Sequence, residues 1–185
     1  MSQQPRRDIA VATVLALLVA GCGSSAPSAT PLPRAASFEQ YAVAACAAWD
    51  SLFRAVGNPD TASGSVLSKS LDDAVTARDA AMAERLAPTI ITELETGRQQ
   101  AAVAGGWQPA GPTMAQMDRV FLAFEAMIQA KRAAARDGPG GLAPQTAFEQ
   151  AGGVEAWQAM FEAYRTIPRP SGAAQQQCGN LPVGP

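Results

Sequence analysis

Histidine is absent from this chain of 185 residues, and aromatic residues make up only 6% of it. Histidine is the usual general base near neutral pH and the commonest ligand for zinc, copper and non-haem iron. Its absence excludes Ser-His-Asp and Cys-His catalysis within the chain. Basic residues are also few, since 14 Lys+Arg stand against 16 Asp+Glu for a net charge of −2. Such a weakly acidic chain lacks the excess of positive charge with which proteins bind nucleic acid.

Motifs for metals, phosphates and acid–base chemistry are missing as well. Residues 58–64 carry several side-chain oxygens, but Lys69 stands where a calcium loop has its closing glutamate. Nothing local to Asp72 and Asp73 desolvates one carboxyl group, as general acid–base catalysis requires. We therefore predict a non-enzymatic protein with no catalytic residue, no metal site and no cofactor. A hydrolase that relies on carboxylates alone is a minor alternative.

The amino terminus has the three-part order of a secretory signal peptide. A polar start with Arg6 and Arg7 is followed by an apolar run over residues 9–20 and then by small residues and Cys22. An apolar run of about a dozen residues is shorter than the roughly 20 needed to span a bilayer. We expect the run to guide export and to be removed.

The cleavage site reads Leu-Val-Ala-Gly-Cys over residues 18–22. It resembles the lipobox of bacterial lipoproteins, with an aliphatic residue, two small residues and an acceptor cysteine. The resemblance covers about the first 22 residues. It implies that residues 1–21 are a signal peptide and that Cys22 receives a diacylglyceryl group and becomes the first mature residue. The alternative is an ordinary secretory signal with a chance cysteine.

Lipidation would place the protein on the extracytoplasmic face of the plasma membrane, or on the outer membrane where the source has one. Two acyl chains hold a protein stably, because each buried methylene contributes about 0.8 kcal/mol. Arg6 and Arg7 also look like a twin-arginine export signal, an alternative to the general route. Residues 22–37 follow as the lipidated cysteine and a Ser- and Pro-rich linker, which as a flexible coil spans roughly 20 Å.

Residues 38–185 form the predicted domain, and its apolar residues recur at steps of three and four, typical of amphipathic helices. Segments with alternating β-branched residues are missing, so no strand is predicted. The predicted helices cover residues 38–56, 66–77, a stretch from Asp79 toward Gly105, 113–136 and about 145–167. We predict an all-α fold, an antiparallel bundle of four to five helices with a tail from about residue 168.

Local signals predict how these helices begin and how their surfaces are charged. Ser37 is placed to cap the first helix, and Thr113 with Gln116 three residues later resembles a capping box. Asp50 and Arg54 stand four residues apart, a spacing that makes opposite charges neighbours on a helix surface.

The cysteines predict a covalent tether. Once Cys22 is acylated, Cys46 and Cys178 remain in an oxidising compartment, where we expect them to form a disulfide that holds the C-terminal tail. A bridge that closes about 130 residues stabilises by roughly 4–5 kcal/mol in the chain-entropy model. The alternatives are a buried free thiol and a reactive thiol, and no histidine or basic cluster supports the second.

The predicted function is a membrane-anchored envelope lipoprotein whose helical domain serves as an interaction or accessory module. Its partners would be the membrane, through the lipid anchor, and an envelope protein. The alternative is a lipoprotein that binds a small apolar ligand between its helices, because methionine and aromatic side chains adapt to such ligands. The candidate ligand-binding residues are Trp107, Met117, Phe121 and Trp157.

Overall fold

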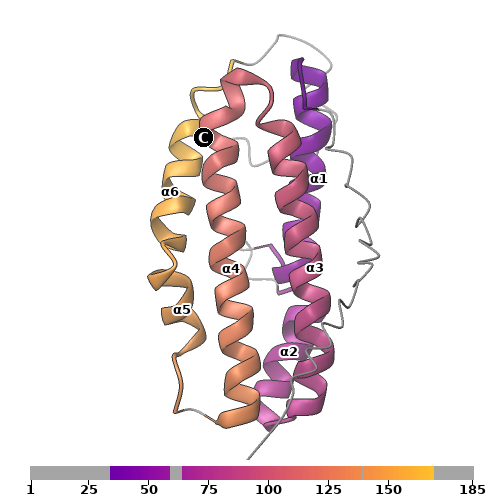
Figure 1. The fold of residues 1–185 in the computed structure, drawn as a ribbon, viewed down its shortest axis with the longest axis vertical. Helices are drawn as coiled ribbons and strands as arrows, with labels where there is room; N and C mark the ends of the chain where they lie inside the picture. Colours follow the sequence, from indigo (N-terminus) through magenta and orange to yellow (C-terminus); the bar gives the residue numbers. More distant parts are fainter. Residues whose placement is uncertain (1–33, 59–63, 139, 169–185) are drawn as a thin grey trace, which may run out of the picture. The chain divides into compact units, whose positions relative to one another are not determined.

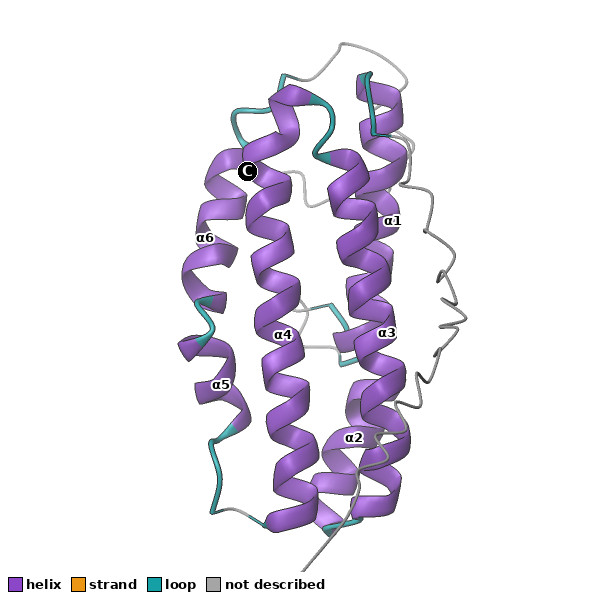
Figure 2. Cartoon of the chain, in the orientation of Figure 1, coloured by secondary structure: helices purple, strands orange, loops and turns teal. Residues whose placement is uncertain are grey.

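The computed structural model describes residues 34–58, 64–138 and 140–168. Helix accounts for 81% of these residues and strand for none, which confirms the predicted all-α class (Figure 2). The six α-helices of the described residues, with one short 3-10 helix, are α1 (Phe38–Val56), α2 (Val66–Ala77), α3 (Ala80–Ala104), η2 (Gln108–Ala110), α4 (Gly111–Asp137), α5 (Pro144–Gln150) and α6 (Gly153–Tyr164). The signal peptide, Cys22, most of the linker and Cys178 lie outside the described residues.

The helices lie side by side around a shared core (Figure 1). α1 packs along α3, α3 along α4, and α4 along α5 and α6, while α2 packs against both α3 and α4. The largest completely buried side chains come mostly from α1, α3 and α4, with one each from α2 and α6; among them are Leu52, Leu71, Ile90, Leu94, Phe121, Ile128 and Met160. Alanines fill most of the remaining core positions, and their small side chains let neighbouring helices approach closely.

Two helix starts follow their local sequence. The Ser37 hydroxyl accepts a hydrogen bond from the Gln40 backbone N–H at 3.4 Å, and the Gln40 side chain accepts one from the Ala36 N–H at 2.7 Å. Asp79 caps α3, because its carboxylate accepts from the Met82 N–H at 2.8 Å. These bonds satisfy amide groups that have no partner inside the helix. The predicted cap at Ser37 is therefore confirmed.

The predicted capping box at Thr113 is wrong. α4 begins two residues earlier, at Gly111, and its cap position makes no side-chain hydrogen bond. Pro112 stands in the first turn, where its missing N–H costs nothing. Thr113 therefore lies inside the helix, 1% exposed, and its hydroxyl has no hydrogen-bond partner among the described residues.

Replacing Thr113 by valine is expected to stabilise the domain. The substitution keeps the shape of the side chain and removes a buried hydroxyl. On folding, this hydroxyl gives up its hydrogen bonds to water and forms none with the described residues. Leaving such a group unsatisfied costs about 1–3 kcal/mol, so the free energy of unfolding should rise by roughly 1 kcal/mol. Urea denaturation measures the change, and Thr113→Ser, which keeps the hydroxyl, is the control. A valine variant no more stable than wild type would contradict the expectation.

The last predicted helix, over about residues 145–167, is divided into α5 and α6. Gly152 has a φ of 75°, in the left-handed region that glycine adopts without strain. Gly153 begins α6, and a Cβ there would lie 2.5 Å from Cζ of Phe148. The two glycines thus turn the chain and let α6 begin against the Phe148 ring, where the sequence predicted only a weakened helix.

Ion pairs connect different helices. Arg54 of α1 pairs with Glu93 of α3 at 3.0 Å, although the sequence placed Asp50 of its own helix beside it. Arg98 of α3 pairs with Asp118 of α4 at 2.8 Å. The side chains in both pairs are about one third to one half exposed, and such pairs are worth only about 0–1 kcal/mol each. These ion pairs therefore contribute little to the free energy of unfolding, and their main effect is on how the helices are aligned.

A third pair joins Glu84 of α3 to Arg132 of α4. Nε of Arg132 donates to Oε2 of Glu84 at 2.8 Å, and a second N–H of Arg132 donates to the same oxygen. This hydrogen bonding holds the pKa of Glu84 below its ordinary value of 4.5. A carboxyl group whose pKa is lowered on folding stabilises above its unfolded pKa, and the contribution is lost as the pH falls through the folded pKa.

Glu84→Gln is therefore expected to lower stability at neutral pH, and its difference from wild type should shrink as the pH falls below 4.5. Urea denaturation at several pH values measures both effects. Glu95→Gln is the matched control, because Glu95 lies exposed on the same helix. The same pH profile for both variants would contradict the assignment.

Candidate functional site

Trp107 packs against the start of α1. Its ring stacks on Tyr41 with centroids 5.2 Å apart and planes at 30°, and meets the edge of Phe38 at 5.5 Å. Trp107 is half-buried and directly precedes η2. This ring therefore joins the α3–α4 connection to α1.

Two of the four predicted ligand-binding residues lie in the core. Met117 and Phe121 of α4 are both completely buried. A Cβ on Gly97 of α3 would overlap Cε1 and Cζ of Phe121, so the ring fills the space that this glycine leaves. Gly97 also faces Ser51 of α1, whose Cβ would lie 3.2 Å away. Gly97 thus lies where α3 packs against both Phe121 of α4 and Ser51 of α1.

The fourth residue, Trp157, belongs to a separate group of rings. We call this group the α1–α6 aromatic cluster. Its members are Trp49, Phe53, Phe124, Phe148, Trp157 and Phe161. Trp49 of α1 meets Trp157 edge-on at 6.0 Å and lies 6.5 Å from Phe161. Trp49 is eight residues beyond Tyr41, about 12 Å along the helix, so Trp107 and Trp157 sit at different levels of α1.

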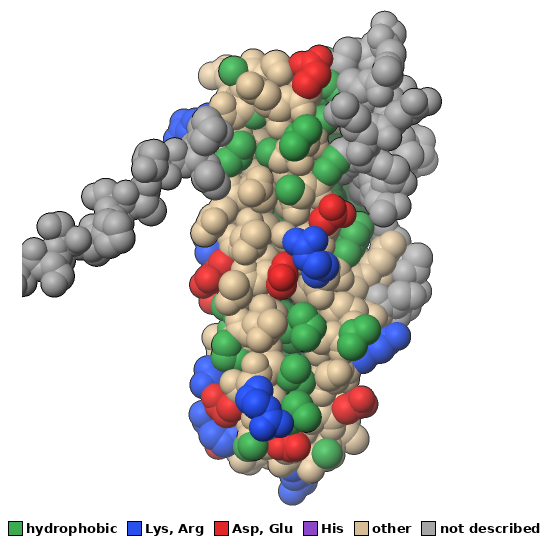
Figure 3. Space-filling model, turned by 90° about the vertical axis from the view of Figure 1, so that its right-hand side faces the viewer, with side chains coloured by type: hydrophobic (Ala, Val, Ile, Leu, Met, Phe, Trp, Pro, Cys, Tyr) green, Lys and Arg blue, Asp and Glu red, His purple; other side chains and the backbone are tan. Residues whose placement is uncertain are grey.

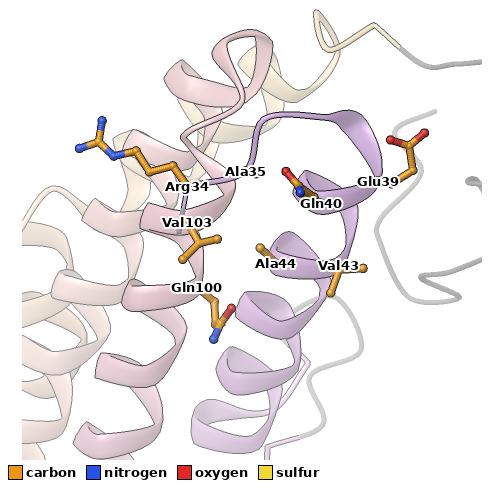
Figure 4. Close-up of a pocket in the computed structure, with 8 residues that line it drawn as sticks. All are labelled: Arg34, Ala35, Glu39, Gln40, Val43, Ala44, Gln100 and Val103. Atoms are coloured by element: carbon orange, nitrogen blue, oxygen red, sulfur yellow. The ribbon is translucent and has the colours of Figure 1, made fainter. Parts of the chain in front are cut away.

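A pocket of about 480 Å³ opens between the start of α1 and the end of α3 (Figure 4). Its volume falls within the range of roughly 300–1,000 Å³ that small-molecule sites occupy. The apolar lining comes from Ala35, Val43, Ala44 and Val103, and the polar rim from Arg34, Glu39, Gln40 and Gln100. Val43 is 62% exposed, the second most exposed of the large apolar side chains in the described residues.

The wall of the pocket is held by the backbone of residues 34–36. The Ala35 N–H donates to the carbonyl oxygen of Val103 at 3.0 Å, and Ala35 is 3% exposed. Gly106 makes this approach sterically possible, because a Cβ there would overlap Cβ of Arg34 and lie 3.0 Å from the Ala35 nitrogen. The chain that leads from the linker into the domain is therefore fixed against the end of α3.

Charged groups stand at the rim and point outward. Figure 4 shows the Arg34 and Glu39 side chains directed away from the pocket on opposite sides. Hydrogen bonds from its own backbone N–H and from Ser37 hold the pKa of Glu39 below its ordinary value, so this carboxylate stays charged. Uncharged side chains line the interior, which suits the apolar part of a ligand.

Sequence reasoning missed this pocket. Neither it nor a smaller one of about 270 Å³ beside Arg34, at the α3–α4 connection, is lined by Trp107, Met117, Phe121 or Trp157. Val43 was the available signal, because it is an apolar residue outside the inward stripe of α1. The stripe of α4 instead supplies core residues.

Charged and hydrophobic side chains are intermixed on one face of the described residues (Figure 3). Figure 3 shows one face on which acidic and basic side chains alternate and hydrophobic ones are scattered. Among the described residues, no three His, Cys, Asp or Glu side chains gather as metal ligands. In the same part of the chain, no helix combines the length and apolarity that crossing a membrane requires.

Similarity to known proteins adds no function to this description. The chain matches no protein-family model, no curated protein and no solved structure.

Proposed function

We propose that this chain is an exported bacterial lipoprotein, held at the membrane by an acylated Cys22, with a helical domain that acts as a non-enzymatic interaction or accessory module of the cell envelope. The observation that carries the proposal is the order of features along the chain. A basic start, an apolar run over residues 9–20, small residues, Cys22 and a Ser- and Pro-rich linker follow one another directly before the first helix. The non-enzymatic part of the proposal follows from the sequence, which contains no histidine to act as the general base of a nucleophile–histidine pair.

The domain itself is proposed to be an antiparallel helical bundle with its tail tethered by a Cys46–Cys178 disulfide. A short connection between α3 and α4, which lie side by side, supports the antiparallel arrangement. An exported location supports the disulfide, because two cysteines remain once Cys22 is acylated.

The attachment of the linker supports a role close to the membrane. Eleven residues lie between Cys22 and Arg34. A chain of that length reaches at most about 40–43 Å when fully extended. Residues 34–36 are fixed to α3 by the bond between Ala35 and Val103. If Cys22 is the anchor, this maximum reach keeps the start of the domain near the membrane, where envelope proteins and lipids would be its neighbours.

Mass spectrometry of membrane-extracted protein tests the proposal. The amino-terminal peptide should begin at Cys22 and carry the mass of a diacylglyceryl group. A mature chain with an unmodified Cys22 would overturn the anchor. Native mass spectrometry after gentle extraction should show a bound protein partner. Turnover of an envelope substrate, abolished by one carboxylate substitution in a folded variant, would overturn the non-enzymatic role.

A second candidate function is the binding of a small apolar ligand. The observation that favours it is the α1–α3 pocket, with an apolar lining and about 480 Å³ of space. The site would then lie at Val43, Ala44 and Val103, apart from the aromatic and methionine residues that the sequence suggested. An acyl chain or another uncharged apolar group fits this chemistry.

Val43→Asp should abolish ligand binding, because an apolar ligand would have to strip water from the new carboxylate. A discrete small mass that remains bound to the wild-type chain in native mass spectrometry is expected to disappear in this variant. Val66→Asp is the matched control, since Val66 is 81% exposed on α2 and does not line the pocket. Equal retention of the small mass by both variants would place the ligand elsewhere.

A further inference from the structure

A second pocket adjoins the α1–α3 pocket and shares Arg34 with it. We call this smaller pocket, of about 270 Å³, the α3–α4 pocket. Besides Arg34, its lining comes from the end of α3, the start of α4 and the connection between them, and includes Ala115 and Asp118. The α1–α3 pocket is lined from α3 by Gln100 and Val103 instead. Arg34 is the only residue that lines both pockets, so it stands between them.

The two pockets differ in size and in the chemistry of their linings. Uncharged side chains line the interior of the α1–α3 pocket, and its volume is that of a small-molecule site. The α3–α4 pocket is smaller than the roughly 300 Å³ at which such sites begin, so it suits one end of a ligand. Gly105, Gly106 and Gly111 line it, and a position without a side chain lets a ligand approach the backbone.

Arg34 gives the α3–α4 pocket its positive charge. Its side chain is directed away from the α1–α3 pocket (Figure 4) and lines the α3–α4 pocket. Among the described residues, no carboxylate forms an ion pair with Arg34, whereas Asp118 is paired with Arg98 at 2.8 Å. A guanidinium group matches the geometry of carboxylate and phosphate oxygens. The α3–α4 pocket is therefore suited to an anionic group.

We propose that the two pockets bind one amphiphile, with its single acyl chain in the α1–α3 pocket and its anionic head group at Arg34 in the α3–α4 pocket. The inference rests on the second candidate function and names its ligand class, an acyl chain that ends in a carboxylate or a phosphate. The apolar lining receives the chain, and the arginine between the pockets receives the charge. The proposed anchor brings such molecules close, because only eleven residues lie between Cys22 and Arg34.

Isothermal titration calorimetry of the full chain with Cys22→Ser, which has no sulfur to acylate, tests the inference. Three probes carry the same myristoyl chain and are used below their micelle concentrations. Myristoyl-lysophosphatidylglycerol and myristate are anionic, and monomyristoylglycerol is uncharged. At least one anionic probe should bind about tenfold more tightly than the uncharged one, as a charge-assisted hydrogen bond provides. The tighter of the two anionic probes identifies phosphate or carboxylate as the preferred head group.

Substitutions locate the head group. Arg34→Gln should remove the preference for anionic probes and leave the affinity for monomyristoylglycerol unchanged, while Arg34→Lys, which keeps the charge, should retain part of the preference. Arg85→Gln is the matched control, because Arg85 is exposed on α3 and lines neither pocket. Ala115 is exposed and lines only the α3–α4 pocket. Ala115→Glu should therefore weaken the binding of the anionic probes alone, through repulsion between like charges.

The possible failures are distinguishable. Equal affinity for charged and uncharged probes, or the same loss in Arg34→Gln and Arg85→Gln, would overturn the head-group site and leave the apolar pocket in place. Glycerol 3-phosphate, which has no acyl chain, would overturn the amphiphile if it bound as tightly as the lysolipid. Absence of binding by every probe with an acyl chain would overturn the second candidate function together with this inference. Failure of the membrane anchor is read separately, from the mass of the peptide that contains Cys22.

Discussion

Gly97→Ala is expected to destabilise the domain by about 2 kcal/mol, although alanine is the better helix former by about 1 kcal/mol. The new Cβ would overlap Cε1 and Cζ of Phe121 and stand 3.2 Å from Cβ of Ser51. Phe121 is completely buried, so its ring has no free space into which to turn. The methyl group must therefore push α3 away from α1 and α4. Urea denaturation measures the loss as a lower midpoint.

Gly111→Ala is the matched control for this substitution. Gly111 is also helical, but a Cβ there has its nearest neighbour, the Gly105 carbonyl oxygen, at 3.7 Å, an ordinary contact. We expect this variant to be as stable as wild type or more stable by up to about 1 kcal/mol. Phe121→Leu should relieve part of the clash, so the double variant with Gly97→Ala is expected to lose less than the sum of the two single losses. Equal destabilisation by both glycine substitutions would contradict the assigned packing.

Cys22→Ala is expected to release the protein from the membrane or to stall its processing, the largest effect predicted for any single residue. The substitution removes the sulfur that would carry the diacylglyceryl group. Without acyl chains the attachment loses about 0.8 kcal/mol for each methylene that had been buried. Fractionation of cells followed by immunoblotting measures the change, and nearly all of the wild-type protein should remain with the membrane.

Cys46→Ser is the matched control for the anchor. It also replaces a cysteine, but one that lies on α1, inside the helical domain. We expect this variant to stay with the membrane. Membrane retention of Cys22→Ala equal to that of wild type would contradict the proposed anchor, and release of both variants would point to misfolding.

The sequence alone was sufficient for the fold class and for several helix ends. Steps of three and four between apolar residues predicted the helices, and alanine-rich composition favours them further. Ser37 is an example of a correctly predicted end, because its hydroxyl bonds an amide only three residues away. Such signals depend on neighbours within one helical turn and can be read along the chain. The export and anchoring prediction likewise depends only on the first 22 residues.

Tertiary structure decided the features that join distant segments. Thr113 is buried inside α4, where its local pattern predicted a cap, because η2 and Pro112 start the helix earlier. Arg54 bonds Glu93 of another helix, 39 residues away. The pocket combines residues 34–44 with Gln100 and Val103, which approach only after α1 has packed against α3. Contacts across such sequence separations depend on helix packing, so periodicity and spacing could not predict this pocket.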